Sequence, residues 1–317
     1  MKIAIASCGT RGDIQPLIAL SLALQKRGHG IIFIAPPENE TMVHQYLANF
    51  VKNHHLGRNI NKLSWRLMLM MTHLNLSKIV NSKRKSLGLK PVTDVYNHFL
   101  ADDLLLACDK ELAEAPSDSQ IKWKQRGYPF LRQGIELPGE VIDFIKSGST
   151  PIYMGFGSMP SDDSEAFVRL LAKAATNVGR RLILSEGWAR LGEMSTSRNR
   201  LLVVRNVPHD KLFEHVACVV HHGGAGTTAT AARAGVPQLV VPHMTDQFYW
   251  GERVFDKSLG PKPIFHSRLS EARLTSALSE VLRNNLYKER AAEMKKRLSA
   301  GEDRKMNAMV SYIEAMI

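Results

Sequence analysis

The chain has 317 residues, 44% of them hydrophobic and 23% charged, which is typical of a soluble globular protein with room for two domains. Its three cysteines, Cys8, Cys108 and Cys218, lie far apart, which argues against a disulfide framework or a zinc site and favours a cytoplasmic setting. No apolar run approaches the roughly 18 residues of a membrane span, and the N-terminus lacks the apolar core of a secretory signal.

The net charge of the chain is +12, and the basic residues lie mostly in 52–90, 122–132, 180–205 and 284–305. Such a distribution is typical either of a solvated basic surface or of a surface that attracts anionic lipid or a phosphorylated substrate. No recognised nucleic-acid-binding motif accompanies the charge, so nucleic acid is not an expected partner.

The N-terminal half opens with a βαβ pattern. A strand over 3–6 leads through a glycine loop, 9–13, to a helix over 15–26 and a second strand over 31–35. The glycine spacing is G-x-x-G, and the second strand ends in Pro36-Pro37 rather than in an acid that would bind a ribose. A dinucleotide site is therefore not predicted.

The segment from Glu40 to Leu112 predicts helices, notably over 63–74 and 76–87, with one short buried strand at 104–107. A methionine cluster at 68–71 is either ordinary core filler or an adaptable apolar surface for an acceptor or a membrane.

The second half alternates strands and helices, which predicts a parallel sheet with right-handed crossovers. The expected strands are 152–156, 181–184, 201–204, 216–220 and 238–241, and the expected helices between them are 163–177, 210–215 and 227–234. A helix over 140–147 precedes the first of these strands, and two or three charged helices are expected over 270–315.

One turn in this half predicts an anion site. The apolar strand over 216–220 ends in His221 and His222 and is joined by glycines to a small-residue helix that stops at Gly235, where a helix commonly needs a left-handed residue. The start of such a helix has free backbone N–H groups and the positive end of its dipole, and His222, Thr227 and Thr228 add side-chain donors. We therefore expect a phosphate at this turn.

The segments around this turn resemble a known family. The sequences HHGGAGTT, RAGVPQLVVP and DQFYWGERV resemble the nucleotide-sugar signature of family 1 UDP-glycosyltransferases. GTRGDIQP and GFGSMP look like the sterol and lipid glucosyltransferase branch, which EGWARL and NVPHDKLF also fit. The resemblance is strong over 1–37 and 146–255 and weaker over 60–135.

This resemblance implies an α/β fold of GT-B architecture, in which two Rossmann-like domains with parallel sheets face a cleft. We expect an acceptor-side domain over 1–137 and a UDP-sugar-binding domain over 138–317, with the last helix, about 307–317, packing back on the first domain. Between Pro37 and Trp65 the family has several more βα units, each about 20–30 residues long, whereas this chain passes to helices. The N-terminal domain is thus expected to be shortened, either in a compact enzyme or in a chain with an incomplete domain. Its exposed edges would favour a partner or a homodimer.

The resemblance further implies inverting transfer of a sugar, with glucose as the first expectation, from a UDP-sugar to a hydroxyl of an apolar acceptor such as a sterol or other lipid. No metal and no other cofactor are expected. The alternative is a non-catalytic UDP-sugar-binding or interaction protein with an incomplete acceptor domain. A cytoplasmic location is expected, with peripheral membrane association left open.

The residues matching the family's donor site have distinct expected roles. The diphosphate would be held by Ser158, His222, Thr227 and the N–H groups of Gly223, Gly224, Ala225 and Gly226. Trp188 would stack on uracil, Val207 would lie beside the donor, and Asp246 and Gln247 would bind sugar hydroxyls. Pro242 to Thr245 replaces the aromatic and glycine residues usual in the family, so the preferred sugar stays open.

The base that removes the acceptor proton would be Asp13, within GTRGD. An exposed aspartate is a weak base near neutral pH, so this role requires burial or a neighbouring charge that raises its pKa. The alternative role for Asp13 is to cap the following helix. Arg11, Gly12 and Thr228 are further candidates, and Arg11 would either steer the diphosphate or pair with a carboxylate.

Overall fold

The chain forms two compact units in the computed structural model: Met1–Glu40, Ala107–Glu114 and Arg126–Ile317 make the first, and Thr41–Leu106 and Ala115–Gln125 the second. The domain boundary at 137/138 stays a prediction. The structure describes residues 2–6, 11–34, 70, 74, 76–95, 98, 104–115, 123–132, 134–156, 164–186, 199–205, 207–244 and 246–316, with the backbone alone for 2, 4, 6, 11–15 and 32–34.

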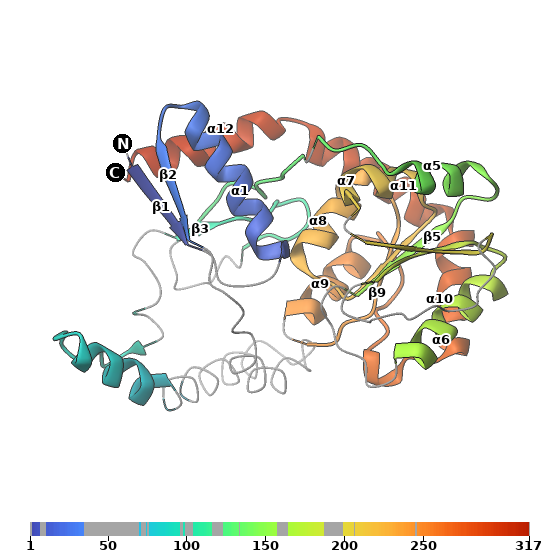
Figure 1. Cartoon of the computed structure of the whole chain (residues 1–317), viewed down its shortest axis with the longest axis horizontal. Coiled ribbons are helices and arrows are strands. Elements are labelled where there is room, and N and C mark those ends of the chain that lie inside the picture. Colours follow the sequence, from blue (N-terminus) through green and yellow to red (C-terminus); the bar gives the residue numbers. More distant parts are fainter. Residues whose placement is uncertain are drawn as a thin grey trace. The chain divides into compact units, whose positions relative to one another are not determined.

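The centre of the first unit is a five-stranded sheet in the order β7-β6-β5-β8-β9 (Figure 1). All neighbouring strands are parallel, so the predicted parallel sheet is confirmed. In chain order the strands are β5 (Ile152–Gly155), β6 (Leu182–Ser185), β7 (Leu201–Val204), β8 (Val219–His221) and β9 (Gln238–Val240).

The strand order places a binding site at one point of the sheet. From β5 the chain adds β6 and β7 on one side and then returns to add β8 and β9 on the other. In an open parallel sheet, ligands bind beyond the carboxyl ends of the strands where the order reverses. Here that point lies between the ends of β5 and β8.

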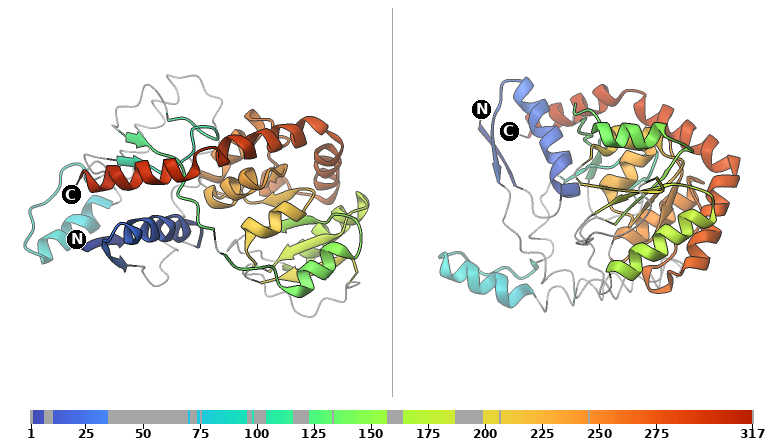
Figure 2. Two further views of the ribbon diagram at one scale, coloured as in Figure 1. Left: turned by 90° about the horizontal axis from the view of Figure 1, so that it is seen from above. Right: turned by 45° about the vertical axis from the view of Figure 1, so that its right-hand side comes forward.

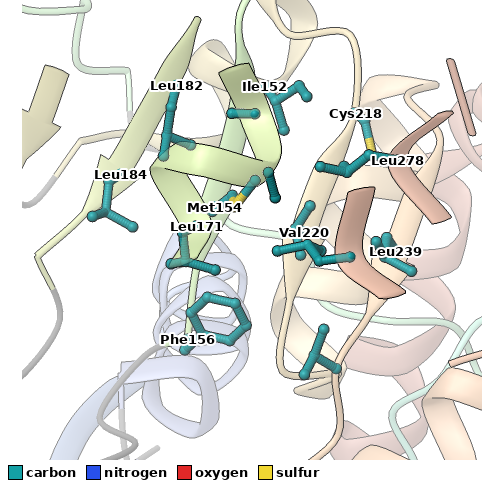
Figure 3. Close-up of a cluster of buried hydrophobic side chains, with 14 of the residues drawn as sticks. Ile152, Met154, Phe156, Leu171, Leu182, Leu184, Cys218, Val220, Leu239 and Leu278 are labelled. Atoms are coloured by element: carbon teal, nitrogen blue, oxygen red, sulfur yellow. The ribbon is translucent and has the colours of Figure 1, made fainter. Parts of the chain in front are cut away.

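Both faces of the sheet are buried. Ile152, Met154, Leu182 and Val220 pack on one face with helices α6 (Ser164–Asn177) and α10 (Glu271–Arg283), as Figure 3 shows for part of this cluster. Tyr153, Ile183 and Val219 point to the opposite face, where they pack with Val141 and Phe144 of α5 (Gly139–Lys146). This alternation follows from the two-residue period of a strand, and it explains why these strands are almost continuously apolar.

Helix α8 (Ala225–Ala234) follows β8 and ends as expected at Gly235, which has a left-handed φ of 73° and donates its N–H to the carbonyls of Ala231 and Ala232. Helix α9 (Asp246–Asp256) was not expected, because its many aromatic and charged residues obscure the helical period. In the first unit the structure also describes α7 (His209–Leu212), the 3₁₀ turns Phe213–His215 and His266–Arg268, α11 (Asn285–Ser299) and α12 (Glu302–Glu314).

The N-terminal βαβ pattern is confirmed. Strands β1 (Lys2–Ala6) and β2 (Gly30–Ile34) pair in parallel, and α1 (Arg11–Lys26) joins them. Helix α1 begins four residues earlier than expected and continues through Pro16. Proline removes one backbone hydrogen bond, but its φ is compatible with a helix. Asp13 therefore lies inside the first turn, and its alternative role as helix cap is wrong.

Helix α12 lies beside α1 within the first unit (Figure 2). The Arg27 guanidinium, just after α1, is 2.6 Å from the Glu314 carboxylate, and the His29 imidazole is 3.0 Å from its other oxygen. Two residues that follow α1 thus bind the end of the C-terminal helix.

In the second unit, β3 (Leu104–Leu106) pairs in parallel with β4 (Trp123–Gln125). Strand β3 is half-buried rather than buried, and β4 was not expected because it is short and largely polar. The predicted helix over 76–87 is confirmed over 76–86, whereas the one over 63–74 lies outside the described residues except for Met70 and Leu74. Among the described residues, no helix has the length and apolar content needed to cross a bilayer.

Candidate functional site

The candidate site is the turn that leads from the end of β8 into α8. Gly223 in this turn has φ +96°, and a Cβ atom there would be 2.8 Å from the Gln247 carbonyl oxygen. A Cβ atom on Gly224 would be 2.6 Å from Nε2 of His222. Both positions accept only glycine without displacement of their neighbours, so the glycines let the backbone and the His222 ring approach each other closely.

The start of α8 presents backbone donors that the helix itself does not use. Gly224 is the N-cap and makes no side-chain cap hydrogen bond, and the first N–H bonded to its carbonyl is that of Thr228, at 3.0 Å. The N–H groups of Ala225, Gly226 and Thr227 therefore have no acceptor within the helix. Together with the helix dipole they favour an anion at this position.

The two threonines of this turn differ. Thr228 is buried, and its hydroxyl donates to the Gly224 carbonyl at 2.9 Å, so it serves the helix itself. Thr227, one residue earlier, is half-buried on the first turn. Of the two hydroxyls, that of Thr227 is the better placed to reach a ligand.

His221 is fully buried and both of its ring nitrogens are engaged. The Gly223 N–H donates to Nδ1 at 3.1 Å, and Nε2 is 2.9 Å from Oε1 of Gln238, which fixes the Nε2–H tautomer. Burial, aided by the neighbouring His222, lowers the pKa of His221 to about 3. His221 is thus a neutral structural residue that holds the glycine turn in place.

His222 has a different environment. Burial lowers the pKa of its imidazole, while the Asp246 carboxylate and a hydrogen bond to the Gly155 carbonyl act in the opposite direction. Its Nδ1 atom is buried and has no hydrogen-bond partner among the described residues. Since buried polar atoms in folded proteins are normally paired, this nitrogen is a candidate to bind a group of a ligand.

Asp246 and Gln247, both in the first turn of α9, are placed differently. Gln247 is buried, and its Oε1 accepts from the backbone N–H groups of His243 at 2.8 Å and Met244 at 3.1 Å. Asp246 is exposed, and its Oδ2 accepts from the Trp250 indole at 3.2 Å. Gln247 therefore shapes the loop after β9, and Asp246 places a carboxylate near His222.

The other expected residues are only partly visible. The Val207 side chain is buried in the core with Val204 and Leu212, so only its backbone could face a ligand. Arg11, Gly12 and Asp13 lie in the first turn of α1, with their side chains outside the description. Ser158 and Trp188 lie outside the described residues.

Two histidines near the site were not predicted. The His243 and His266 rings stack with centroids 4.1 Å apart, and Phe156, at the end of β5, lies 6.0 Å from the His243 ring. Burial, with the nearby His266 and His222, lowers the pKa of His243 to about 3. The only sequence signal was the segment Pro242 to Thr245, which departs from the family pattern.

These groups can bind an anion. The donors are backbone N–H groups at the positive end of a helix dipole, and His222 can donate from Nδ1 when its imidazole takes up a proton, which the Asp246 carboxylate and the Gly155 carbonyl favour. A diphosphate spreads its charge over several oxygens, each of which can accept from such a donor.

Two family models match the chain. The glycosyltransferase family 28 N-terminal domain matches residues 3–101, and the erythromycin biosynthesis protein CIII-like C-terminal domain matches residues 171–309. The second match contains β8, α8 and α9, and therefore the turn around His222.

Curated relatives and solved structures agree with these models. The chain is 33% identical over 227 residues, 70% of its length, to a sterol 3-beta-glucosyltransferase from Arabidopsis thaliana, and covers 36% of that protein. It is 39% identical over 210 residues, 64% of its length, to the vancomycin aglycone glucosyltransferase of Amycolatopsis orientalis, and covers 50% of it. The fold matches the glycosyltransferase of kitacinnamycin with a TM-score of 0.72 and 17% identity, over 100% of this chain and 99% of that one.

The chain thus spans half or less of the length of these two curated relatives. Both of its halves match glycosyltransferase families, and its fold is that of GT-B glycosyltransferases. The chain thus resembles glycosyltransferases along both of its halves and has their GT-B fold, and sterol glucosyltransferases are among the relatives that it matches.

Proposed function

We propose that this protein transfers a glucosyl group, with inversion and without a metal, from UDP-glucose to a hydroxyl of an apolar acceptor such as a sterol. The observation that carries this proposal is the start of α8, where three backbone N–H groups without helical acceptors lie next to His222. The description of curated relatives as sterol and aglycone glucosyltransferases supports the choice of sugar and of an apolar acceptor.

In the proposed reaction the acceptor oxygen attacks C1 of the sugar from the face opposite the diphosphate. The bond between C1 and the diphosphate oxygen breaks, and UDP leaves with the bonding electrons. The N–H groups of α8 and His222 stabilise the negative charge that develops on the diphosphate. Asp13 takes the acceptor proton, Ser158 and Thr227 add contacts to the phosphates, Trp188 and the Val207 backbone hold the uridine, and Asp246 and Gln247 orient the sugar.

Donor binding is tested by titration calorimetry with UDP. The substitution His222→Ala is expected to weaken UDP binding by about tenfold or more, because it removes a charge-assisted hydrogen bond to phosphate. His215→Ala, at an exposed histidine, is the matched control and should bind like the wild type. An unchanged affinity of the His222 variant, or no heat at millimolar UDP, would contradict the proposed donor site.

The same titration reports the protonation of His222. Burial lowers the pKa of the free imidazole, and an arriving diphosphate would raise it. UDP binding near neutral pH should therefore take up a proton, seen as a heat that depends on the ionisation enthalpy of the buffer, and this dependence should shrink in His222→Ala.

Transfer is tested by mass spectrometry of products formed from UDP-glucose and a mixed pool of sterols, other lipids and phenols. Asp13→Asn should abolish most turnover and leave UDP binding intact, while Asp143→Asn, at an exposed aspartate of α5, should be unaffected. Full turnover of the Asp13 variant would remove it as the base. UDP binding with no product from the wild type would favour the alternative, a non-catalytic UDP-sugar-binding protein.

A further inference from the structure

The second unit carries most of the net positive charge of the protein. Between Glu40 and Asp94 the sequence contains no acidic residue. The same stretch contains nine basic residues: Lys52, Arg58, Lys62, Arg66, Lys78, Lys83, Arg84, Lys85 and Lys90. The rest of the chain therefore has a net charge of only +3, and the charge is concentrated rather than spread over the surface.

The helix over 76–86 (teal in Figure 1) exposes apolar and cationic side chains together. Ile79 is 61% exposed, and Lys78, Lys83 and Lys85 are exposed on the same helix. Leu74, one turn before Lys78, is also exposed. A single exposed isoleucine is common on a protein surface, whereas several exposed apolar side chains close together mark an interaction surface.

The helix ends in a turn that presents two more leucines. Gly88 has φ +70°, its N–H bonds to the Lys85 carbonyl at 3.1 Å, and the Leu89 N–H bonds to the Arg84 carbonyl at 2.9 Å. This is a regular glycine helix end. Leu87 is 62% exposed and Leu89 49% exposed, one on each side of Gly88.

The turn is held by side chains of the helix itself. The Asn81 amide donates to the Val92 carbonyl at 3.0 Å and accepts from the Val92 N–H at 2.7 Å. The Arg84 guanidinium donates to the Lys90 carbonyl at 2.7 Å. Because these bonds fold residues 90–92 back on the helix, the exposure of Leu87 and Leu89 is a built feature of the turn and not fraying of a helix end.

The lysines around the turn have no acidic partner in the part of the chain that the structure describes. Lysine side chains can extend their stems along apolar matter while the ammonium groups contact phosphates. Leucines between such lysines suit the boundary between the headgroups and acyl chains of a bilayer, and the positive charge suits anionic lipids. Proteins that bind single-stranded nucleic acid usually stack aromatic side chains on the bases, and residues 76–92 contain no aromatic residue.

We propose that Leu87 and Leu89, with Ile79 and the flanking Lys83, Lys85 and Lys90, form a docking surface for a bilayer that contains anionic lipid. The two leucines enter the boundary between the headgroups and the acyl chains, and the lysines bind headgroup phosphates. This surface lies in the second unit and not in the donor turn around His222, so its test does not depend on sugar transfer.

The experiment is flotation of the full-length protein with vesicles of phosphatidylcholine alone or mixed with phosphatidylglycerol. The wild type should bind only the mixed vesicles, and added salt should weaken this binding. The variant Leu87→Ser/Leu89→Ser should lose about tenfold in affinity. The variant Lys83→Gln/Lys85→Gln/Lys90→Gln should lose about a hundredfold in affinity, given roughly 1 kcal/mol per lysine at an anionic surface.

Matched controls come from exposed residues of the first unit. Ile135→Ser/Leu286→Ser removes two exposed apolar side chains, and Lys173→Gln/Lys288→Gln/Lys296→Gln removes three exposed lysines. Both controls should bind vesicles like the wild type, and all variants should bind UDP like it. Equal binding to both kinds of vesicle, or an unchanged affinity of either variant of the turn, would overturn the proposal. So would a wild type that forms a dimer through this turn and leaves vesicles unbound.

Discussion

At the scale of single residues, the adjacent His221 and His222 show how neighbouring side chains of one type acquire different roles. His221 points from β8 into the core, where the Gly223 N–H and the Gln238 amide use both of its nitrogens. His222 lies one residue later, against Gly224, and its Nδ1 is unpaired among the described residues. The difference follows from their positions, since His221 is the last residue of β8 and His222 is the first residue of the turn.

The buried histidines predict a dependence of stability on pH. Burial lowers the pKa of His221 and of His243 from about 6.5 to about 3, so the unfolded chain binds protons that the folded chain does not. The free energy of unfolding should therefore be constant above about pH 7 and fall as the pH drops below about 6.5, by up to about 1.4 kcal/mol per pH unit for each histidine.

This dependence is measured by urea unfolding between about pH 7.5 and pH 5, above the range where most carboxylates titrate. His221→Asn keeps an acceptor for the Gly223 N–H but removes one titrating group, so its curve should be flatter than that of the wild type. His215→Asn, at an exposed histidine, should keep the slope of the wild type. Parallel curves for the wild type and His221→Asn would show that His221 does not cause the acid destabilisation.

At this scale the sequence predicted part of the site. The glycine turn was predictable because a strand, a glycine run and a small-residue helix follow one another without interruption. That Thr228 bonds to its own helix and Gln247 to the loop after β9 could not be predicted, because these contacts depend on side-chain direction. The His243–His266 stack joins residues 23 positions apart, and no local pattern reports such a pair.

At the scale of elements, helix α5 depends on one arginine from outside it. Arg181, which precedes β6 and is only 8% exposed, donates to the carbonyls of Phe144, Ile145 and Ser149 and to the Ser147 hydroxyl. Its guanidinium also lies 4.6 Å from the Phe144 ring centroid. A cation thus satisfies the last carbonyls of α5 and interacts favourably with the negative end of its dipole.

Arg181→Met should lower the free energy of unfolding by about 2–4 kcal/mol, because it retains an apolar stem but leaves several carbonyls without a donor. Arg181→Lys should recover only part of the loss, since one ammonium group cannot reach all of these acceptors. Arg180→Met, at the neighbouring and more exposed arginine, serves as the control in the same urea titration. A loss in the control as large as that in Arg181→Met would contradict this account.

The elements themselves were largely predictable. The strands of the main sheet are apolar runs bounded by turn residues, and their positions agree with the structure to within about three residues. Strand β4 and helix α9 were missed because neither has a clear apolar period. The start of α1 was predicted too late, because glycine and proline near it indicated a loop. In the structure Gly12 and Pro16 are part of the helix.

At the scale of the molecule, the first unit is held together by a buried ionic network that joins three distant segments. Asp109 is fully buried, and its carboxylate lies 2.7 Å from the Arg233 guanidinium in α8 and 3.2 Å from the Lys305 ammonium in α12. Arg233 also pairs with Glu302 of α12 at 3.2 Å. The short segment Ala107–Glu114 is thereby fixed to α8 and α12, although the residues lie more than a hundred positions apart.

Removing one partner of a buried pair leaves an uncompensated charge, so Asp109→Asn should cost about 3–5 kcal/mol of unfolding free energy. Arg233→Met should cost a similar amount, and the double variant should cost less than the sum by about 2 kcal/mol or more. The exposed pair Arg290–Glu293 provides the control cycle, with a coupling below about 1 kcal/mol. Additive effects of Asp109→Asn and Arg233→Met would contradict a direct pairing.

The long-range architecture was less accessible from sequence than its parts. Resemblance predicted the fold, but no pattern predicted that Asp109 would pair with Arg233, because both residues look like ordinary surface charges in the sequence. The homodimer considered for a shortened N-terminal domain stays a prediction, to be checked by light scattering.

The glycine turn before α8 limits which residues of this site can be substituted during evolution. The groups expected to hold the diphosphate are mostly N–H groups of the main chain, which every amino acid except proline possesses. Side chains around the turn other than those of His222 and Thr227 can therefore change, while Gly223, with its positive φ and the Gln247 carbonyl 2.8 Å from an added Cβ, cannot. In a saturation library selected for donor binding, the smallest residue of the turn, Gly223, should therefore be the one that tolerates the fewest substitutions.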